Sequence, residues 1–180
     1  FGKISKVSYS PKSYNNKYGV PLSIFNINKH DDFNIFEIGM DKKGEIDLLS
    51  KIIKPDVGVI TNISYAHAKN FKNLNQIADA KSEIINNINS NGSMVLNADD
   101  IFFKKHKKIA LSKNLKIYSF SLRKPNANVC IKKIIKLKNK YKILINVNKK
   151  QKIFFIKSIF ENNLQNMLAA LAVISIFKNV

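Results

Sequence analysis

The chain has 180 residues, enough for one well-buried domain or for one domain and part of another, and too few for a large multidomain enzyme. Its formal net charge of +19 would ordinarily suggest a nucleic acid or an anionic surface as partner. Only one of the 31 basic residues is an arginine, Arg123, and the lysines are spread along the chain beside many Asn and Ile residues. Because proteins that bind phosphate backbones usually use the bidentate arginine as well, we expect no specific nucleic-acid partner.

The only cysteine, Cys130, excludes an internal disulfide and a cysteine-based zinc site, which fits a reducing, cytoplasmic setting. No apolar run approaches the roughly 20 residues that a membrane span needs. The chain starts at Phe1 without an initiator methionine, and residues 163–180 have the pattern of a helix without a terminator. We therefore interpret the chain as an internal piece of a longer protein.

The first predicted strand places a carboxylate at its end. Apolar residues within 33–38 indicate a buried strand, and Gly39 marks the point where the backbone leaves the sheet. In open α/β sheets, ligands bind beyond the carboxyl ends of the strands, so Glu37 lies at the expected edge. This carboxylate is the first indication of a metal site.

Helices and strands then alternate. A helix opens at 43–45 and ends before Pro55, with apolar residues at helical spacing: Ile46, Leu49, Ile52 and Ile53. The pattern continues with strands at 57–63, 94–96 and 117–120 and helices at 74–88 and 102–111. This alternation predicts an α/β fold with a doubly wound, mostly parallel sheet.

The pattern changes after Arg123. From 129 to 159 apolar and lysine-rich residues alternate, with turn signals at Asn139-Lys140 and Asn148-Lys149. We expect a small antiparallel meander at the edge of the sheet, with its lysines on the solvent-exposed face as protection of that edge.

His67 and Lys81 follow the strand predicted at 57–63 and complete a candidate site. His67 emerges at the same sheet edge as Glu37, and the two could share a metal ion, although a histidine after a strand is more often a surface or packing residue. Lys81 lies on the inward line of its helix with Ile77 and Ile88, where a lysine is costly unless it is paired. Either its stem runs along the apolar face to water, or it is held near an anion or metal, or modified.

Six strings of residues occur in the order and spacing of a known family and cover nearly the whole chain. They are SYNNKYGVPLS at 13–23, EIGMDKKGEI at 37–46, TNISYAH at 61–67, AKSEI at 80–84, LNADD at 96–100 and NNLQNMLAALAV at 162–173. Together they resemble the central, ATP-binding domain of the Mur ligases, a P-loop NTPase-like fold. Within this family, the chain resembles the branch that adds D-alanyl-D-alanine. The resemblance rests on the GEI string, the NN-x-x-G-V-P-L string and Ala66 before His67.

The resemblance implies a chemistry and roles for residues. Such ligases use ATP to phosphorylate a carboxylate of a UDP-MurNAc-peptide, and the amine of D-alanyl-D-alanine then attacks the acyl-phosphate to form an amide. The implied magnesium ligands are Glu37, His67 and Lys81, the last as a carbamylated, catalytic lysine. The implied ATP-binding residues are Asn16, Asn163 and Asn166, and the implied substrate-binding residues are Asn15, Asn16 and Asn62. We expect a monomeric enzyme of peptidoglycan synthesis.

The sequence also departs from the family. Its glycine-rich phosphate loop would precede Phe1, and the C-terminal ligase domain would follow, so we expect 1–180 to be an incomplete central domain. A Gly-x-His-Asn string of the family is replaced by Phe160-Glu161-Asn162-Asn163, and Asp41-Lys42 replace a common Asn-His pair. Three alternatives stay open: a related ATP-dependent ligase with another acid substrate, a basic nucleic-acid-binding protein, and a non-catalytic relative.

Overall fold

The computed structural model describes residues 2, 5–65 and 70–177, and the chain divides into two compact units. Unit 1 comprises the described residues up to Asp56 and those from Ile63 to Ser90. Unit 2 comprises Val57–Asn62 and the described residues from Asn91 onwards. Each unit is described by itself below.

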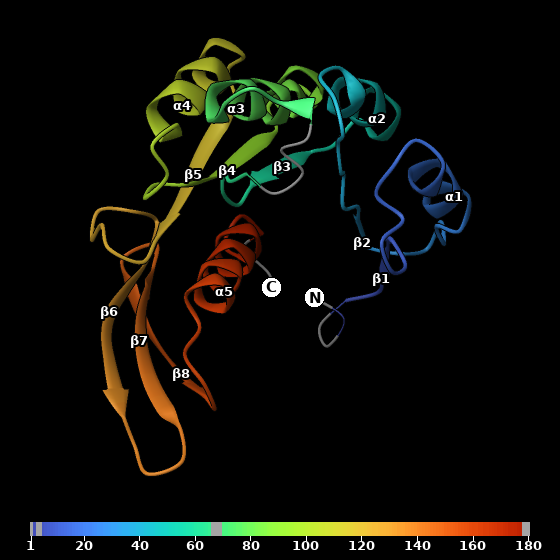
Figure 1. Ribbon diagram of the computed structural model, residues 1–180. Helices are drawn as coiled ribbons and strands as arrows, with labels where there is room; N and C mark the ends of the chain where they lie inside the picture. The colour runs from blue at the N-terminus through green and yellow to red at the C-terminus, as the bar shows by residue number, and fades with distance from the viewer. Residues whose placement is uncertain (1, 3–4, 66–69, 178–180) are drawn as a thin grey trace. The chain divides into compact units, whose positions relative to one another are not determined.

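The described part of unit 1 contains a two-stranded parallel sheet and three α-helices (Figure 1). Strand β1 (Val7–Tyr9) pairs with β2 (Phe33–Ile35), with Val7 opposite Phe33. The strand predicted at 33–38 is therefore shorter than expected, and the prediction that it is buried was wrong, since Ile35 is 45% exposed. A sheet of two short strands offers little apolar surface for other elements to pack against, and no residue of β2 is fully buried.

The helices of unit 1 are α1 (Gly19–Phe25), α2 (Glu45–Ile53) and α3 (Leu74–Ser82). Helix α2 confirms the predicted element: it buries Ile46 and Leu49, although Ile52 is 51% exposed. The helix predicted at 74–88 is α-helical only as far as Ser82 and continues as a 3-10 helix, η2 (Glu83–Asn87). This change of helix type alters the direction in which the side chains after Ser82 point, because a 3-10 turn has three residues instead of 3.6.

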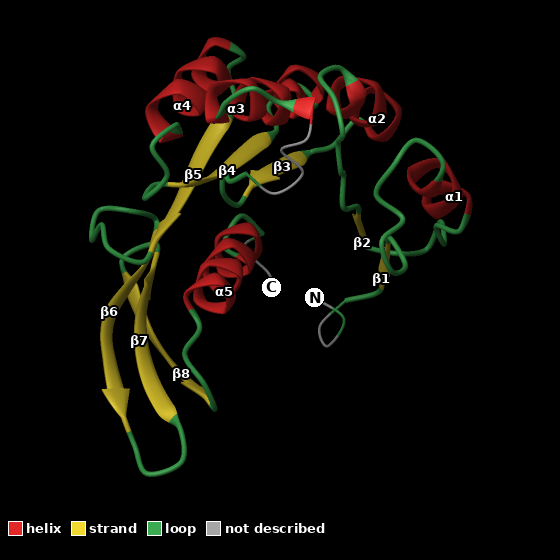
Figure 2. Cartoon of the chain, viewed as in Figure 1, coloured by secondary structure: helices red, strands yellow, loops and turns green. Residues whose placement is uncertain are grey.

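Unit 2 is built on a six-stranded sheet whose strands follow one another in chain order (Figure 2). The strands are β3 (Val57–Ile60), β4 (Ser93–Asn97), β5 (Lys116–Ser121), β6 (Val129–Lys136), β7 (Tyr141–Val147) and β8 (Lys150–Ile156). Neighbours from β3 to β6 are parallel, and β6, β7 and β8 are antiparallel. This confirms the predicted α/β class with a mostly parallel sheet and an antiparallel meander at its edge.

Helices α4 (Phe103–Ser112) and α5 (Glu161–Ile174) lie on opposite sides of β4 and β5 (Figure 1). Every residue of β4 is buried, as is typical of a strand covered on both faces. The core on the α5 side joins strand residues to one stripe of the helix: Val95, Phe120, Val129, Ile143, Ile145, Leu164, Leu168, Ala169 and Ala172. The helix predicted to run from 163 to 180 ends at Ile174 and is followed by a turn.

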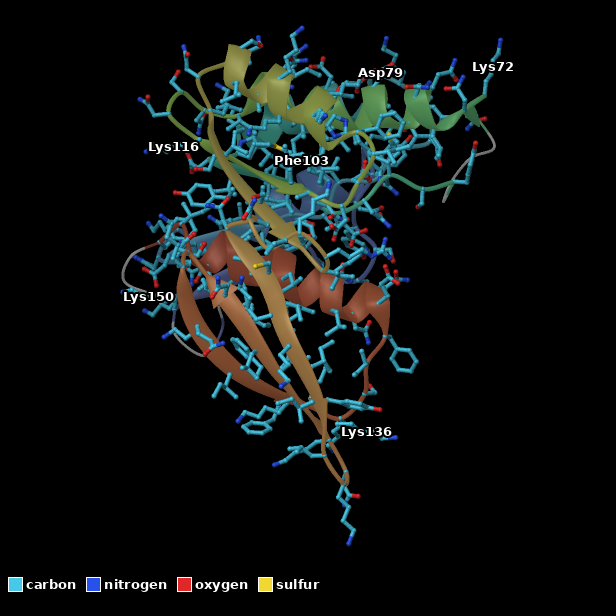
Figure 3. The ribbon with its side chains drawn as sticks, turned by 90° about the vertical axis from the view of Figure 1, so that its left-hand side faces the viewer. Lys72, Asp79, Phe103, Lys116, Lys136 and Lys150 are labelled. Atoms are coloured by element: carbon cyan, nitrogen blue, oxygen red, sulfur yellow. The ribbon has the colours of Figure 1, made fainter. Side chains whose placement is uncertain are left out.

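The lysines of the meander are exposed, apart from the half-buried Lys142. Figure 3 shows Lys136 at the end of β6 and Lys150 at the opposite end of the meander, where β8 begins. Asn148 and Lys149, which form the predicted turn, have φ of 47° and 69°, the left-handed conformation that a two-residue hairpin turn requires.

Among the residues that the structure describes, no helix has the length and apolar composition to cross a membrane.

Candidate functional site

The carboxylate of Glu37 lies just beyond β2 and is held by a side chain from the segment before α1. Asn15 Nδ2 donates a hydrogen bond to Glu37 Oε1 over 2.8 Å. The carbonyl oxygen of Asn15 accepts a hydrogen bond from the N–H of Gly39 over 2.7 Å. A Cβ atom at Gly39 would lie 3.0 Å from Asn15 Cγ, so the glycine allows the two segments to approach. The sequence predicted Glu37 and Asn15 as site residues, and the structure brings them together.

Asn16 has a local structural role in unit 1. Its Oδ1 accepts hydrogen bonds from the N–H groups of Tyr18 (3.0 Å) and Gly19 (2.9 Å), at the start of α1. These are donors that a helix N-terminus leaves without intrahelical partners. The side chain of Asn16 therefore holds the turn that leads into α1, and Asn16 is an exposed residue.

The loop from Gly39 to Gly44 connects the Glu37 region to α2 and is held by backbone hydrogen bonds to a carboxylate. Glu45 Oε2 accepts from the N–H groups of Asp41 (2.6 Å) and Lys42 (3.1 Å). The bond from Asp41 is the main cause that lowers the pKa of Glu45 below its ordinary value of 4.5. The charged form of Glu45 thus stabilises the loop in which Asp41 and Lys42 replace the common Asn-His pair.

Lys81 occupies the last turn of α3 and is half-buried, next to the fully buried Ala80. The prediction that this lysine lies toward the inner side of its helix is consistent with that burial. Two residues later, Glu83 accepts hydrogen bonds from the N–H groups of Gly44 and Asp47 at the start of α2. Glu83 lies within the AKSEI string but was not predicted as a site residue, because its partners are distant in the sequence.

An open hollow of unit 1 lies beside these elements. It is lined by Lys42, Lys43, Asn70, Phe71, Gln76 and Asp79. Figure 3 shows Asp79 on α3 and Lys72 just before that helix begins, with side chains that project outward. The lining combines two lysines with amide and carboxylate groups, so it offers donors and acceptors to a polar ligand.

The remaining described candidates belong to unit 2. Asn62 is half-buried in the loop that follows β3, and Asn97 Nδ2 holds that loop by donating to the carbonyl oxygen of Thr61 over 3.0 Å. Asn163 and Asn166 are both exposed on α5, three residues apart and therefore on one side of the helix. Their exposure leaves their amides accessible to a ligand.

The LNADD string of unit 2 is fixed by hydrogen bonds to β5. Asp99 Oδ1 accepts from Ser121 Oγ over 2.6 Å, and its Oδ2 accepts from the N–H of Leu122 over 2.7 Å. Lys124 Nζ also donates to the carbonyl oxygen of Ala98. This string therefore closes the carboxyl end of β4 against the end of β5.

The described residues around Glu37 supply some, but not all, of the ligands that a divalent cation needs. Glu37 is exposed, and among the described residues only Asn15 donates to its carboxylate, so oxygen lone pairs remain for a hard cation such as Mg²⁺. His67 lies outside the described residues. Within the described ranges, no group of three or more His, Cys, Asp or Glu side chains could hold a metal ion without help from other ligands.

Comparison with known proteins gives the class of this domain. Residues 2–174 match the family model described as the Mur ligase middle domain, and the chain belongs to that family. The UDP-N-acetylmuramoyl-tripeptide--D-alanyl-D-alanine ligase of Borreliella burgdorferi is 40% identical over 128 residues, which are 71% of this chain and 26% of that protein. The ligase of the same name from Buchnera aphidicola subsp. Baizongia pistaciae is 37% identical over 113 residues, 63% of this chain and 24% of that protein.

Solved structures agree in fold. A crystal structure of MurF from Acinetobacter baumannii superposes with a TM-score of 0.86 at 28% identity, covering 96% of this chain and 37% of that chain. MurF ligase from Thermotoga maritima, in complex with ADP, gives a TM-score of 0.84 at 25% identity, covering 96% of this chain and 39% of that chain. The chain spans about a quarter of the length of the curated relatives it matches.

Proposed function

We propose that this chain is the ATP-binding middle domain of a UDP-N-acetylmuramoyl-tripeptide:D-alanyl-D-alanine ligase. In the proposed reaction, ATP phosphorylates the terminal carboxylate of the UDP-MurNAc-tripeptide, and the amine of D-alanyl-D-alanine displaces phosphate to form an amide. The curated relatives carry this name, and the T. maritima structure contains ADP, which supports ATP as the nucleotide. The reaction would take place in the cytoplasm, where ATP is available, and we propose a monomer.

We propose that Glu37, His67 and Lys81 hold magnesium in this reaction. When bound, magnesium neutralises charge on the phosphoryl oxygens and orients them. Glu37 supplies a carboxylate oxygen, and Asn15 orients that carboxylate through its hydrogen bond. Lys81 would act after its ammonium group loses one proton and the neutral amine adds to CO₂, which forms an N–C bond and releases a second proton, so that a cation becomes a carbamate anion. That change of sign would let a lysine serve as a ligand of a divalent cation.

We propose the asparagines as ligands of the nucleotide and the peptide substrate. Asn163 and Asn166 would donate to ATP from the exposed side of α5. Asn15, Asn16 and Asn62 would bind the substrate near the reacting carboxylate, with Asn16 also beside the nucleotide. We further propose that the chain works within a longer protein that also supplies a phosphate loop and a C-terminal ligase domain.

The contact between Asn15 and Glu37 is the observation that carries this proposal. It joins two of the family strings, 13–23 and 37–46, which are separated in the sequence. The test is release of phosphate from ATP by the full-length protein with UDP-MurNAc-tripeptide and D-alanyl-D-alanine together. We expect release only when both are present. Release with a single amino acid in place of the dipeptide, and none with the dipeptide, would identify a ligase of another specificity.

A further inference from the structure

Glu83 links two strings that lie far apart in the sequence, GEI at 44–46 and AKSEI at 80–84. Its Oε1 accepts from the N–H of Gly44 over 2.8 Å, and its Oε2 accepts from the same N–H over 3.0 Å. Oε2 also accepts from the N–H of Asp47 over 3.1 Å. The three hydrogen bonds connect positions 36 and 39 residues apart, so the contact is entirely tertiary.

Helix α2 needs this carboxylate because it has no capping side chain of its own. Its N-cap residue is Gly44, with φ of 92°, and no side-chain capping bond is formed by that residue. The first N–H groups of a helix lack intrahelical partners, and the positive end of the helix dipole attracts an anion. Glu83 supplies both the acceptor atoms and the negative charge that a Ser or Asp at the N-cap would normally provide in part.

The capped end of α2 is also the end of the loop that follows Glu37. The start of that loop is fixed where Gly39 donates to the carbonyl oxygen of Asn15. Its far end is fixed where Gly44 donates to Glu83, which follows Lys81 by two residues in the chain. One carboxylate therefore sets the position of the end of α3 relative to the loop after Glu37.

We propose that Glu83 is a positioning residue, which holds the Lys81 end of α3 against the loop that follows Glu37 so that both ligands reach one divalent cation. This inference rests on the proposed function. Both oxygens of Glu83 accept backbone hydrogen bonds at the start of α2, so the role that we assign to Glu83 is to position Lys81 and Glu37.

The test compares Glu83→Ala and Glu83→Gln with Asn89→Ala in the full-length protein. Asn89 is a matched control because its Nδ2 holds the opposite end of α2, donating to the carbonyl oxygen of Lys54 (2.9 Å) and to Asp56 Oδ1 (2.8 Å). Binding of Mn²⁺ alone is measured by electron paramagnetic resonance, and exchange of the Gly44 and Asp47 amide hydrogens is measured in parallel.

We expect Glu83→Ala to weaken Mn²⁺ binding by about 10-fold, as loss of groups that orient metal ligands does, and to speed exchange of both amides. Glu83→Gln keeps one acceptor oxygen and should fall between wild type and alanine. Asn89→Ala should leave Mn²⁺ binding unchanged. Normal Mn²⁺ binding by Glu83→Ala, or an equal loss in Asn89→Ala, would overturn the proposal.

The ligation assay separates this inference from the proposed function. Suppose that the wild type ligates D-alanyl-D-alanine and that Glu83→Ala binds Mn²⁺ normally. The positioning role of Glu83 would then be wrong, and the proposed function would stand. Suppose instead that the wild type has no ligase activity and that Glu83→Ala binds Mn²⁺ more weakly. The proposed function would then be wrong, and Glu83 would still be a residue that positions a cation site.

Discussion

Asn15 and Glu37 are joined side chain to side chain over 2.8 Å, although 22 residues separate them in the chain. The amide of Asn15 thereby fixes one oxygen of an exposed carboxylate and leaves the other side of the group open. A carboxylate held in this way is oriented before any ligand arrives, which reduces the entropy lost on binding.

Replacing either proposed metal ligand, with Glu37→Ala or His67→Ala, should lower turnover of the full-length protein by at least about 100-fold, because charge on the phosphoryl group is then poorly neutralised. Glu37 is exposed, so its loss should change the free energy of unfolding by no more than about 0.5 kcal/mol. Phosphate release and urea unfolding check the two effects. Normal turnover of both variants at low magnesium concentration would contradict the assignment.

Lys81→Ala should nearly abolish formation of the acyl-phosphate, because the proposed carbamate can no longer form. Added acetate should restore part of the activity by placing a carboxylate in the vacated space. Lys81→Arg keeps the positive charge but is not carbamylated, so it should stay inactive. Isotope exchange between ADP and ATP measures the phosphorylation step, and an active arginine variant would show that a cation suffices there.

Gly19→Ala should destabilise the protein by roughly 1–3 kcal/mol, the usual cost of overpacking. A Cβ atom at this position would lie 2.5 Å from Tyr14 Cα and 2.7 Å from the Tyr14 carbonyl carbon, and backbone atoms cannot move aside as a side chain can. Chemical denaturation measures the change. Gly2→Ala is the control, since a Cβ atom there meets nothing within 4 Å, and equal stability of the two variants would rule out the steric argument.

Protonation of Glu45 should lower the free energy of unfolding in mild acid. Hydrogen bonding, chiefly from the N–H of Asp41, lowers the pKa of Glu45 below its ordinary value of 4.5 in the folded chain. The unfolded chain therefore binds the proton more readily, so the contribution of Glu45 is complete above pH 4.5 and is lost as the pH falls through the lower, folded pKa.

The contribution of Glu45 should be less than about 1 kcal/mol, since the residue is only half-buried and solvent screens its charge. Urea unfolding of the wild type and of Glu45→Gln between pH 3 and 7 provides the measurement. The difference between the two should shrink toward low pH. A difference that is constant over this range would show that the charge of Glu45 does not stabilise the loop.

Local patterns in the sequence were sufficient for several elements. The spacing of Ile46 and Leu49 determined which side of α2 is buried, and the Asn148-Lys149 turn determined one hairpin of the meander. These signals depend on residues that are neighbours in the chain, so their physical basis is complete within each segment. Strand β1 went unpredicted because three residues are too few to show a period.

Motifs in the sequence also determined the family and named Asn15, Glu37 and Lys81 as candidates. Only the tertiary structure decided that the 33–35 strand lies in a two-stranded sheet, that Asn15 holds Glu37, and that Glu83 caps α2. An unpaired helix end or an exposed carboxylate can be satisfied by many groups, and the local sequence does not specify which. The choice is made when folding brings distant residues within hydrogen-bond distance, as it does for Glu83 and Gly44, 39 residues apart.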